Sequence, residues 1–187
     1  MITDPRMTDY LHSLESSQGV LLDEIEKKAL EDRVPIIRKE TAALLRALIY
    51  GIRPMRILEI GTAVGYSALL MCQAMPAGGS IVTIEKYEKR IAEARENFAR
   101  SGMEDRITLL EGDADELLDT LEGQSFDLIF MDAAKGQYLG WLSRLIPMMP
   151  CGAFLVSDNV LQDGDVVQSR FAIERRNRTI HSRMREY

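Results

Sequence analysis

The 187-residue chain has few cysteines and no long hydrophobic run. Cys72 and Cys151 lie far apart without a CxxC spacing, so we expect buried free thiols in a reducing cytoplasm rather than a disulfide or a nucleophile. No apolar run approaches the roughly 20 residues of a membrane span. Residues 1–10 also lack the hydrophobic block of a secretory signal. We therefore expect a cytoplasmic protein with no membrane partner.

Internal repeats and low-complexity linkers are also absent from the sequence. The composition, with 46% hydrophobic and 28% charged residues, is typical of one globular domain. We predict a single domain over residues 1–187, with N-terminal helices within 1–50 and an α/β core over 56–187.

The net charge of −6 argues against a nucleic-acid partner, but the charge is unevenly distributed. Residues 166–187 carry six arginines against two glutamates, and Arg33, Arg38 and Lys39 form a smaller basic group. Two interpretations remain open. These residues either cover solvated helix faces or form a surface that contacts phosphates.

Short apolar runs alternate with amphipathic stretches from residue 56 onward, which predicts parallel βαβ units. Residues 8–50 show helical spacing, with a break at Pro35. An open parallel sheet binds ligands beyond the carboxyl ends of its strands. The expected strands are 56–60, 80–84, 106–110, 126–131 and 153–157, and the helices between them are 65–75, 87–101, 113–121 and 137–147.

Oxygen-bearing side chains follow two of these predicted strands directly. Asp132 follows the expected strand 126–131, and Asp158 and Asn159 follow the expected strand 153–157. Two carboxylates and an amide oxygen form a ligand set suited to Mg²⁺ or Ca²⁺. The sequence therefore predicts a divalent-cation site at one edge of the sheet.

The turn after the first strand contains Gly61 and Gly65, which favour a tight turn and close approach of a ligand. Ala63 stands between them, so the dinucleotide fingerprint GxGxxG is absent. Glu59 before the turn would oppose a phosphate but would suit an ammonium group, as in S-adenosylmethionine.

Two further acidic positions follow the second and third strands. Glu85 is placed to hold ribose hydroxyls, although it could instead be a solvated acid in the first turn of a helix. Asp113 and Ala114 end the third strand, where they could border an adenine. Together with Glu59, these positions favour a nucleoside cofactor that lacks phosphates.

Three motifs, at residues 58–67, 131–138 and 157–161, together resemble the cation-dependent O-methyltransferases of the catechol and caffeoyl-CoA type. Within that family, residues 34–37, 133–138 and 174–178 are most similar to the bacterial tRNA 5-hydroxyuridine methyltransferases. The resemblance implies a Rossmann-like class I methyltransferase fold, with a mostly parallel sheet, helices on both faces and a homodimeric assembly.

The resemblance also implies roles for individual residues. Lys135 corresponds to the active-site lysine, expected either to accept a proton or to hold an oxyanion. The implied Mg²⁺ ligands are Asp132, Asp158 and Asn159, and the implied S-adenosylmethionine contacts are Glu59, Gly61, Ser67, Glu85, Asp113, Ala114 and Asp132.

Family members end with a further pair of strands, whereas this sequence ends at Tyr187 within what resembles the preceding helix. Either the sequence is a truncated or partly ordered copy, or the protein lacks this pair. Without the pair, we expect the fifth strand to be an open edge.

The activity that the resemblance implies is methylation of the 5-hydroxyl of wobble 5-hydroxyuridine in tRNA, giving 5-methoxyuridine. One alternative is a small catechol or phenolic acceptor, and another is a non-catalytic module that binds the cofactor or RNA. Tyr138 and Trp141 could stack on a base or could simply pack in a helix. His12 and His181 are isolated, and we expect no role for them.

Overall fold

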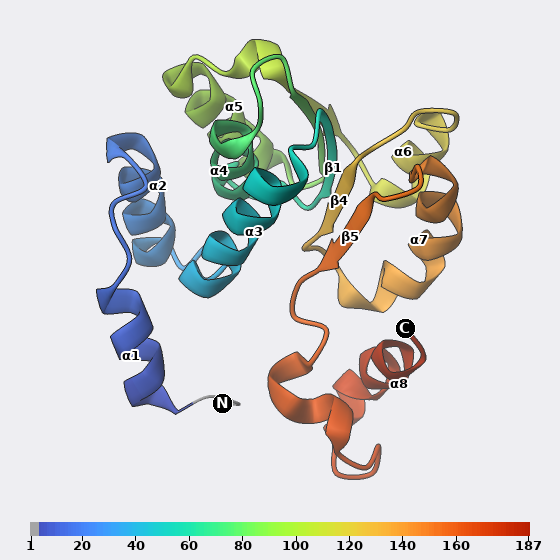
Figure 1. Cartoon of the computed structure of the whole chain (residues 1–187). Coiled ribbons are helices and arrows are strands. Elements are labelled where there is room, and N and C mark those ends of the chain that lie inside the picture. Colours follow the sequence, from blue (N-terminus) through green and yellow to red (C-terminus); the bar gives the residue numbers. More distant parts are fainter. Residues whose placement is uncertain (1–3) are drawn as a thin grey trace.

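The computed structural model describes residues 4–187, apart from the side chain of residue 163. Its centre is a five-stranded, fully parallel sheet in the order β3-β2-β1-β4-β5 (Figure 1). This arrangement confirms the predicted Rossmann-like fold. The strands are β1 (Arg56–Ile60), β2 (Ser80–Glu85), β3 (Ile107–Glu111), β4 (Leu128–Met131) and β5 (Phe154–Ser157).

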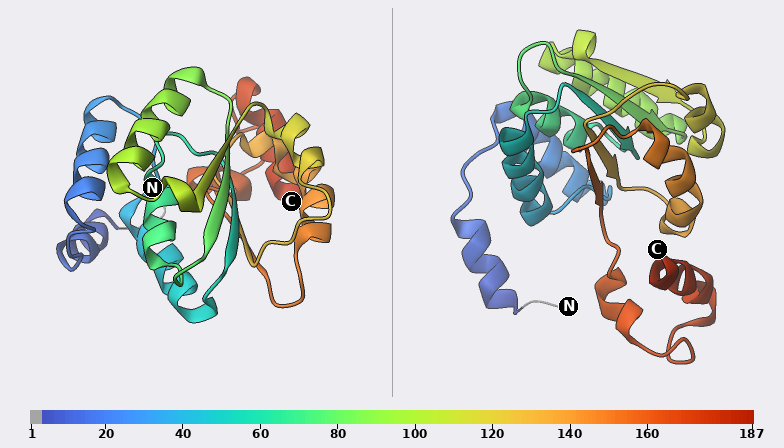
Figure 2. Two further views of the ribbon diagram at one scale, coloured as in Figure 1. Left: turned by 90° about the horizontal axis from the view of Figure 1, so that it is seen from above. Right: turned by 45° about the vertical axis from the view of Figure 1, so that its right-hand side comes forward.

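Helices cover both faces of the sheet (Figure 2). One face carries α2 (Val20–Glu31), α3 (Lys39–Ile52), α4 (Tyr66–Ala74) and α5 (Glu88–Ser101), and α1 (Pro5–Ser13) contacts α3. The other face carries α6 (Ala114–Thr120), α7 (Tyr138–Leu145) and α8 (Arg178–Glu186). Short 3₁₀ turns are η1 (Glu104–Arg106), η2 (Lys135–Gln137), η3 (Ile146–Met148), η4 (Gln162–Val167) and η5 (Arg175–Asn177).

Alternation along each strand divides the hydrophobic core between the two faces. In β4, Leu128 and Phe130 pack toward α4, whereas Ile129 and Met131 pack toward α6 and α7. Successive side chains of a strand point to opposite sides of the sheet. A strand covered on both faces is therefore apolar along its whole length, which explains the continuous apolar runs in the sequence.

β5 is the last strand found in the part of the chain that the structure describes, and only β4 pairs with it. The exposed Phe154 side chain at its start is consistent with the predicted open edge. Beyond β5, residues 162–187 form η4, η5 and α8, and α8 packs against η2 and η4.

The two cysteines have different environments. Cys72 is buried in α4, as expected, whereas Cys151 is exposed. The expectation of a buried thiol at position 151 was wrong because this residue lies in the turn before β5. Among the described residues, no helix is both long and apolar enough to cross a bilayer.

The turn between β1 and α4 brings two chain segments unusually close together. Gly61 has a φ of +106°, and a β-carbon there would lie 2.2 Å from the backbone oxygen of Asp132. Only glycine fits both the conformation and the approach. The β1–α4 turn is therefore in direct contact with the loop that leaves β4.

We predict that Gly61→Ala lowers the free energy of unfolding by roughly 2–4 kcal/mol, because the new methyl group clashes with backbone. Gly140→Ala in α7 is the matched control, since nothing lies within 4 Å of the added β-carbon. The control should be neutral or stabilising by up to about 1 kcal/mol. Urea unfolding of both variants checks this, and a Gly61→Ala protein as stable as wild type would contradict it.

Candidate functional site

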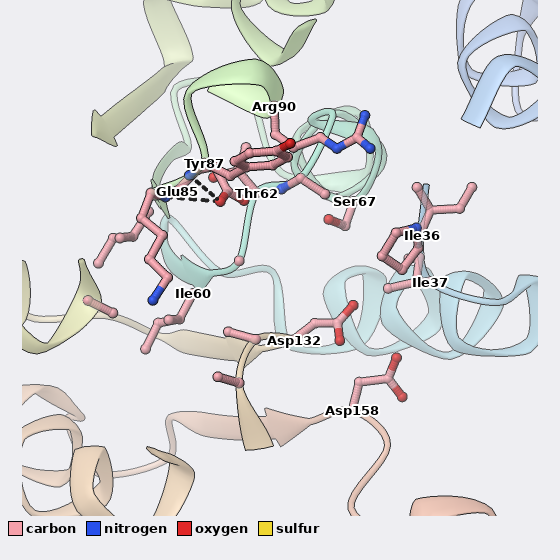
Figure 3. A pocket seen from close by; sticks show the side chains of 18 of the residues that line it. Ile36, Ile37, Ile60, Thr62, Ser67, Glu85, Tyr87, Arg90, Asp132 and Asp158 are labelled. Carbon is pink, nitrogen blue, oxygen red and sulfur yellow. Dashed lines mark hydrogen bonds between the residues drawn. The ribbon is translucent and has the colours of Figure 1, made fainter. Parts of the chain in front are cut away.

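A cavity of about 660 Å³ lies at the carboxyl ends of the strands (Figure 3). Its walls include residues 34–38, 60–63, 84–87, 132–135 and 158–159. Open parallel sheets bind their ligands at this place. Most of the residues predicted from the sequence line it: Gly61, Ser67, Glu85, Asp113, Ala114, Asp132, Lys135, Asp158 and Asn159.

Asp132 and Asp158 follow neighbouring strands directly. Their strands pair up to Met131 and Ser157, and the Asp158 amide donates to the Met131 oxygen at 2.9 Å. Both carboxylates point into the cavity in Figure 3. Burial, and next the negative charge of Asp158, raise the pKa of Asp132, while Lys135 opposes this effect. Such a pair of converging carboxylates fits a bound cation.

The described residues contain no cluster of three His, Cys, Asp or Glu side chains that could hold a metal. A cation bound by Asp132 and Asp158 would therefore need a further ligand that is not His, Cys, Asp or Glu. Asn159 lines the same part of the cavity and has a φ of +56°, a left-handed conformation that asparagine tolerates well. Its backbone amide also donates to Asp158 Oδ1 at 2.7 Å. Asp132, Asp158 and Asn159, the three predicted cation ligands, thus line one cavity.

Lys135 begins η2 and also lines the cavity. Its Nζ lies 3.8 Å from Asp132 Oδ1, and both side chains are about one-quarter exposed. The Lys135 ammonium group therefore lies beside one carboxylate of the candidate cation site.

Glu59 is the one predicted cofactor residue that does not line the cavity. It is fully buried, and its carboxylate accepts hydrogen bonds of 2.5 Å from Ser67 Oγ and from Thr83 Oγ1. Strand alternation explains this placement, because Glu59 shares the sheet face of Ile57 and points under α4. Ser67, and not Glu59, lines the cavity wall, and the contact of Glu59 with an ammonium group stays a prediction.

The Glu59 carboxylate nevertheless affects what Ser67 offers to a ligand. Ser67 gives its single hydroxyl proton to Glu59, so the oxygen lone pairs remain free to accept from a donor in the cavity. Burial raises the pKa of Glu59 to about 7, against the opposing hydrogen bonds from Ser67 and Thr83. Negative charge on Glu59 is therefore sensitive to pH near neutrality.

Glu85 ends β2 with its carboxylate at the cavity edge. Oε2 accepts from the Ala63 amide at 2.8 Å, and Oε1 accepts from the amides of Lys86 and Tyr87 at 2.9 Å each. These bonds fix the carboxylate, which disfavours the alternative of a freely solvated acid. Oε1 already accepts two hydrogen bonds, whereas Oε2 accepts one and can accept another from a ligand hydroxyl.

Asp113 has a structural role that the sequence interpretation did not include. It is the N-cap of α6, where Oδ1 accepts from the Asp115 amide at 3.0 Å. Oδ2 pairs with Lys86 Nζ at 3.0 Å, and the backbone bond from Asp115 is the main cause that lowers the Asp113 pKa. The neighbouring Ala114 is buried and offers a small apolar surface to the cavity.

Two residues that sequence reasoning did not single out also line the cavity. Tyr87 and Arg90 lie at the start of α5, with the Arg90 guanidinium carbon 5.9 Å from the Tyr87 ring centre (Figure 3). Both could have been predicted from their positions two and five residues after Glu85. The first turn of the helix that follows β2 lies near the carboxyl end of that strand.

The two aromatic residues left open by the sequence have different environments. Tyr138 is fully buried, so its ring cannot stack on a ligand. Trp141 is also buried but borders the cavity, and its Nε1 donates to Asp115 Oδ1 at 2.7 Å.

A family model described as O-methyltransferase matches residues 12–185. Catechol O-methyltransferase of Mycobacterium tuberculosis is 34% identical over 131 residues, which are 70% of this chain and 60% of that protein. Catechol O-methyltransferase of Niastella koreensis is 37% identical over 114 residues, 59% of this chain and 52% of that protein. The chain thus aligns with only about half to three-fifths of these relatives.

Solved structures of O-methyltransferases have a similar fold. The O-methyltransferase from Bacillus cereus in complex with SAH has a TM-score of 0.83 at 26% identity, covering 95% of this chain and 82% of that one. TomG from Streptomyces achromogenes, in complex with SAM, has a TM-score of 0.85 at 27% identity, covering 100% and 86%.

We predict that Glu59 makes stability depend on pH. Its folded pKa of about 7 exceeds the ordinary 4.5, so its contribution is full below pH 4.5 and is lost as pH rises through 7. Between pH 5 and 8, wild type should lose about 2–3 kcal/mol of unfolding free energy relative to Glu59→Gln, because the amide does not titrate.

Urea unfolding at both pH values measures this difference. Glu116→Gln is the control, since this exposed residue of α6 undergoes the same chemical change. A difference between wild type and Glu59→Gln that is the same at pH 5 and pH 8 would show that Glu59 does not titrate in this range.

Proposed function

Because the chain belongs to the O-methyltransferase family, we propose that it transfers a methyl group from S-adenosylmethionine to a hydroxyl that has a second oxygen beside it, with Mg²⁺ or another divalent cation. One observation carries the proposal. The Asp132 and Asp158 carboxylates converge on a cavity whose opposite wall holds the fixed carboxylate of Glu85 (Figure 3). We infer that one cavity holds both a cation site and a nucleoside site.

The cofactor half of the cavity suits S-adenosylmethionine. Glu85 Oε2 can accept from a ribose hydroxyl, and Ser67 can accept from the ammonium group of the methionine part. Gly61 lines this half of the cavity, and Ala114 offers an apolar surface to the adenine. Phosphate-binding groups are not needed for this cofactor, which agrees with the acidic residues at the strand ends.

The acceptor half would use Asp132, Asp158 and Asn159 to hold the cation. When bound, a divalent cation favours the ionised form of an acceptor hydroxyl. Mg²⁺ takes six oxygen ligands, so three protein oxygens leave positions for two neighbouring acceptor oxygens. An acceptor of this kind is therefore oriented by the same residues that activate it.

Lys135 is placed to accept the hydroxyl proton or to hold the resulting oxyanion. The oxygen then attacks the sulfonium methyl, so that a C–O bond forms, the C–S bond breaks and the sulfonium becomes a thioether. The cavity walls contribute by holding the two reactants in line.

We propose 5-hydroxyuridine in tRNA as the acceptor, because its ring hydroxyl lies beside a carbonyl oxygen. The arginine-rich residues 166–187 support an RNA partner, since they pack beside the cavity loop at η2. Arg183 makes this contact by donating from Nη1 to the Gly136 oxygen. Exposed Arg170, Arg175 and Arg185 lie in the same segment. The homodimer expected from the family resemblance stays a prediction.

A small catechol is the second candidate acceptor. It offers the same pair of neighbouring oxygens, and the two relatives described above bear the name catechol O-methyltransferase. A non-catalytic module that binds cofactor or RNA is less favoured, because RNA binding gains nothing from converging carboxylates.

The proposal predicts methyl transfer to tRNA that carries unmethylated 5-hydroxyuridine, with S-adenosylmethionine and Mg²⁺, detected by nucleoside mass spectrometry. Chelation of the cation should abolish the product. Activity should also fall steeply with salt, because phosphate contacts release counterions. Transfer to catechol alone, without steep salt dependence, would overturn RNA as the acceptor. It would leave the proposed cation-dependent methyl transfer in place.

Asp158→Ala tests the cation site in the same assay. The variant should lose at least about 100-fold in turnover while keeping RNA binding, because the cation loses a carboxylate ligand. Removing one of two repelling charges should not unfold the protein. Asp119→Ala, at an exposed position of α6, is the control. Full turnover by Asp158→Ala, or transfer that resists chelators, would contradict the proposed mechanism.

A further inference from the structure

The hydroxyl of Tyr138 lies where β4 and β5 leave the sheet. Tyr138 is the first residue of α7 and is fully buried. Its hydroxyl oxygen is 3.1 Å from the Ala133 amide and 3.1 Å from the Met131 oxygen, and it lies 3.5 Å from the Asp158 oxygen. One side chain thus spans the backbone on both sides of Asp132 and also reaches the backbone of Asp158.

These bonds continue the strand pairing past the point where the ladder ends. The last backbone bond between the two strands runs from the Asp158 amide to the Met131 oxygen. Beyond it the chains separate, one toward η2 and the other toward η4. The Tyr138 hydroxyl accepts from Ala133 and has one proton, which is shared between the oxygens of Met131 and Asp158.

The ring of Tyr138 is held from behind by two other aromatic residues. Trp141 lies 6.2 Å away between ring centres, and Tyr187 meets the ring edge-on at 5.9 Å. Tyr187 in turn bonds Ser157 Oγ through its hydroxyl at 2.5 Å. Burial raises the pKa of Tyr138 above its ordinary value, so the hydroxyl keeps its proton. The side chain is therefore fixed in place, and it does not line the cavity.

We propose that Tyr138 is a positioning residue that sets the separation of Asp132 and Asp158. This inference rests on the proposed function, because it requires that the two carboxylates bind a divalent cation. Mg²⁺ demands near-ideal octahedral geometry, so a small change in the spacing of two ligands weakens binding. Groups that orient metal ligands typically contribute 10–100-fold to affinity.

Tyr138→Phe removes only the hydroxyl and keeps the buried ring. We expect the Kd for Mn²⁺, measured by electron paramagnetic resonance of the free ion, to rise roughly 10-fold or more. The Kd for S-adenosylhomocysteine, measured by calorimetry, should change less than about twofold, because Tyr138 does not line the cavity. A general loss of packing would weaken both ligands, so the two constants separate positioning from simple destabilisation.

Tyr187→Phe is the matched control, since it removes a hydroxyl from the same aromatic cluster without touching the backbone at the strand ends. It should leave the Mn²⁺ affinity unchanged. Equal Mn²⁺ affinity in wild type and Tyr138→Phe, or an equal loss in both tyrosine variants, would overturn the role of Tyr138 alone. Failure of wild type to bind Mn²⁺ would overturn the cation site itself, and with it this inference.

Discussion

Repulsion between two carboxylates at neighbouring strand ends is the constraint on which the rest of the site depends. Parallel pairing of β4 and β5 up to Met131 and Ser157 forces Asp132 and Asp158 to follow side by side. Burial of Asp132, and next the negative charge of Asp158, raise the pKa of Asp132, which is the cost of holding its carboxylate in this place. A divalent cation removes that cost, so the same feature that weakens the free protein would create its affinity for a metal.

The β1–α4 turn, which lines the proposed cofactor half of the cavity, contacts the loop after β4 that carries Asp132. Gly61 in the β1–α4 turn touches the backbone oxygen of Asp132, so neither segment can move far without the other. The buried Glu59 carboxylate accepts a hydrogen bond from Ser67 Oγ and so fixes the Ser67 hydroxyl at the cavity wall. In the proposed reaction, both reactants would therefore be positioned by groups that belong to one continuous structure, as alignment requires.

Strand positions and strand-end residues could be predicted from the sequence, because apolar runs bounded by polar residues define buried strands. Asp132, Asp158 and Glu85 line the cavity as expected for that reason. The direction of Glu59 could not be predicted in the same way, since it depends on which helices cover each sheet face. The hydrogen bonds of the Tyr138 hydroxyl could not be predicted either, because its partners are backbone atoms at the ends of two separate strands.

Anomalous diffraction from crystals soaked with Mn²⁺ and S-adenosylhomocysteine would test the central claim most directly. We predict one strong Mn²⁺ peak within coordination distance of oxygen atoms of Asp132, Asp158 and Asn159, next to the bound cofactor. A peak elsewhere, or none at saturating Mn²⁺, would contradict a cation site built from these strand ends.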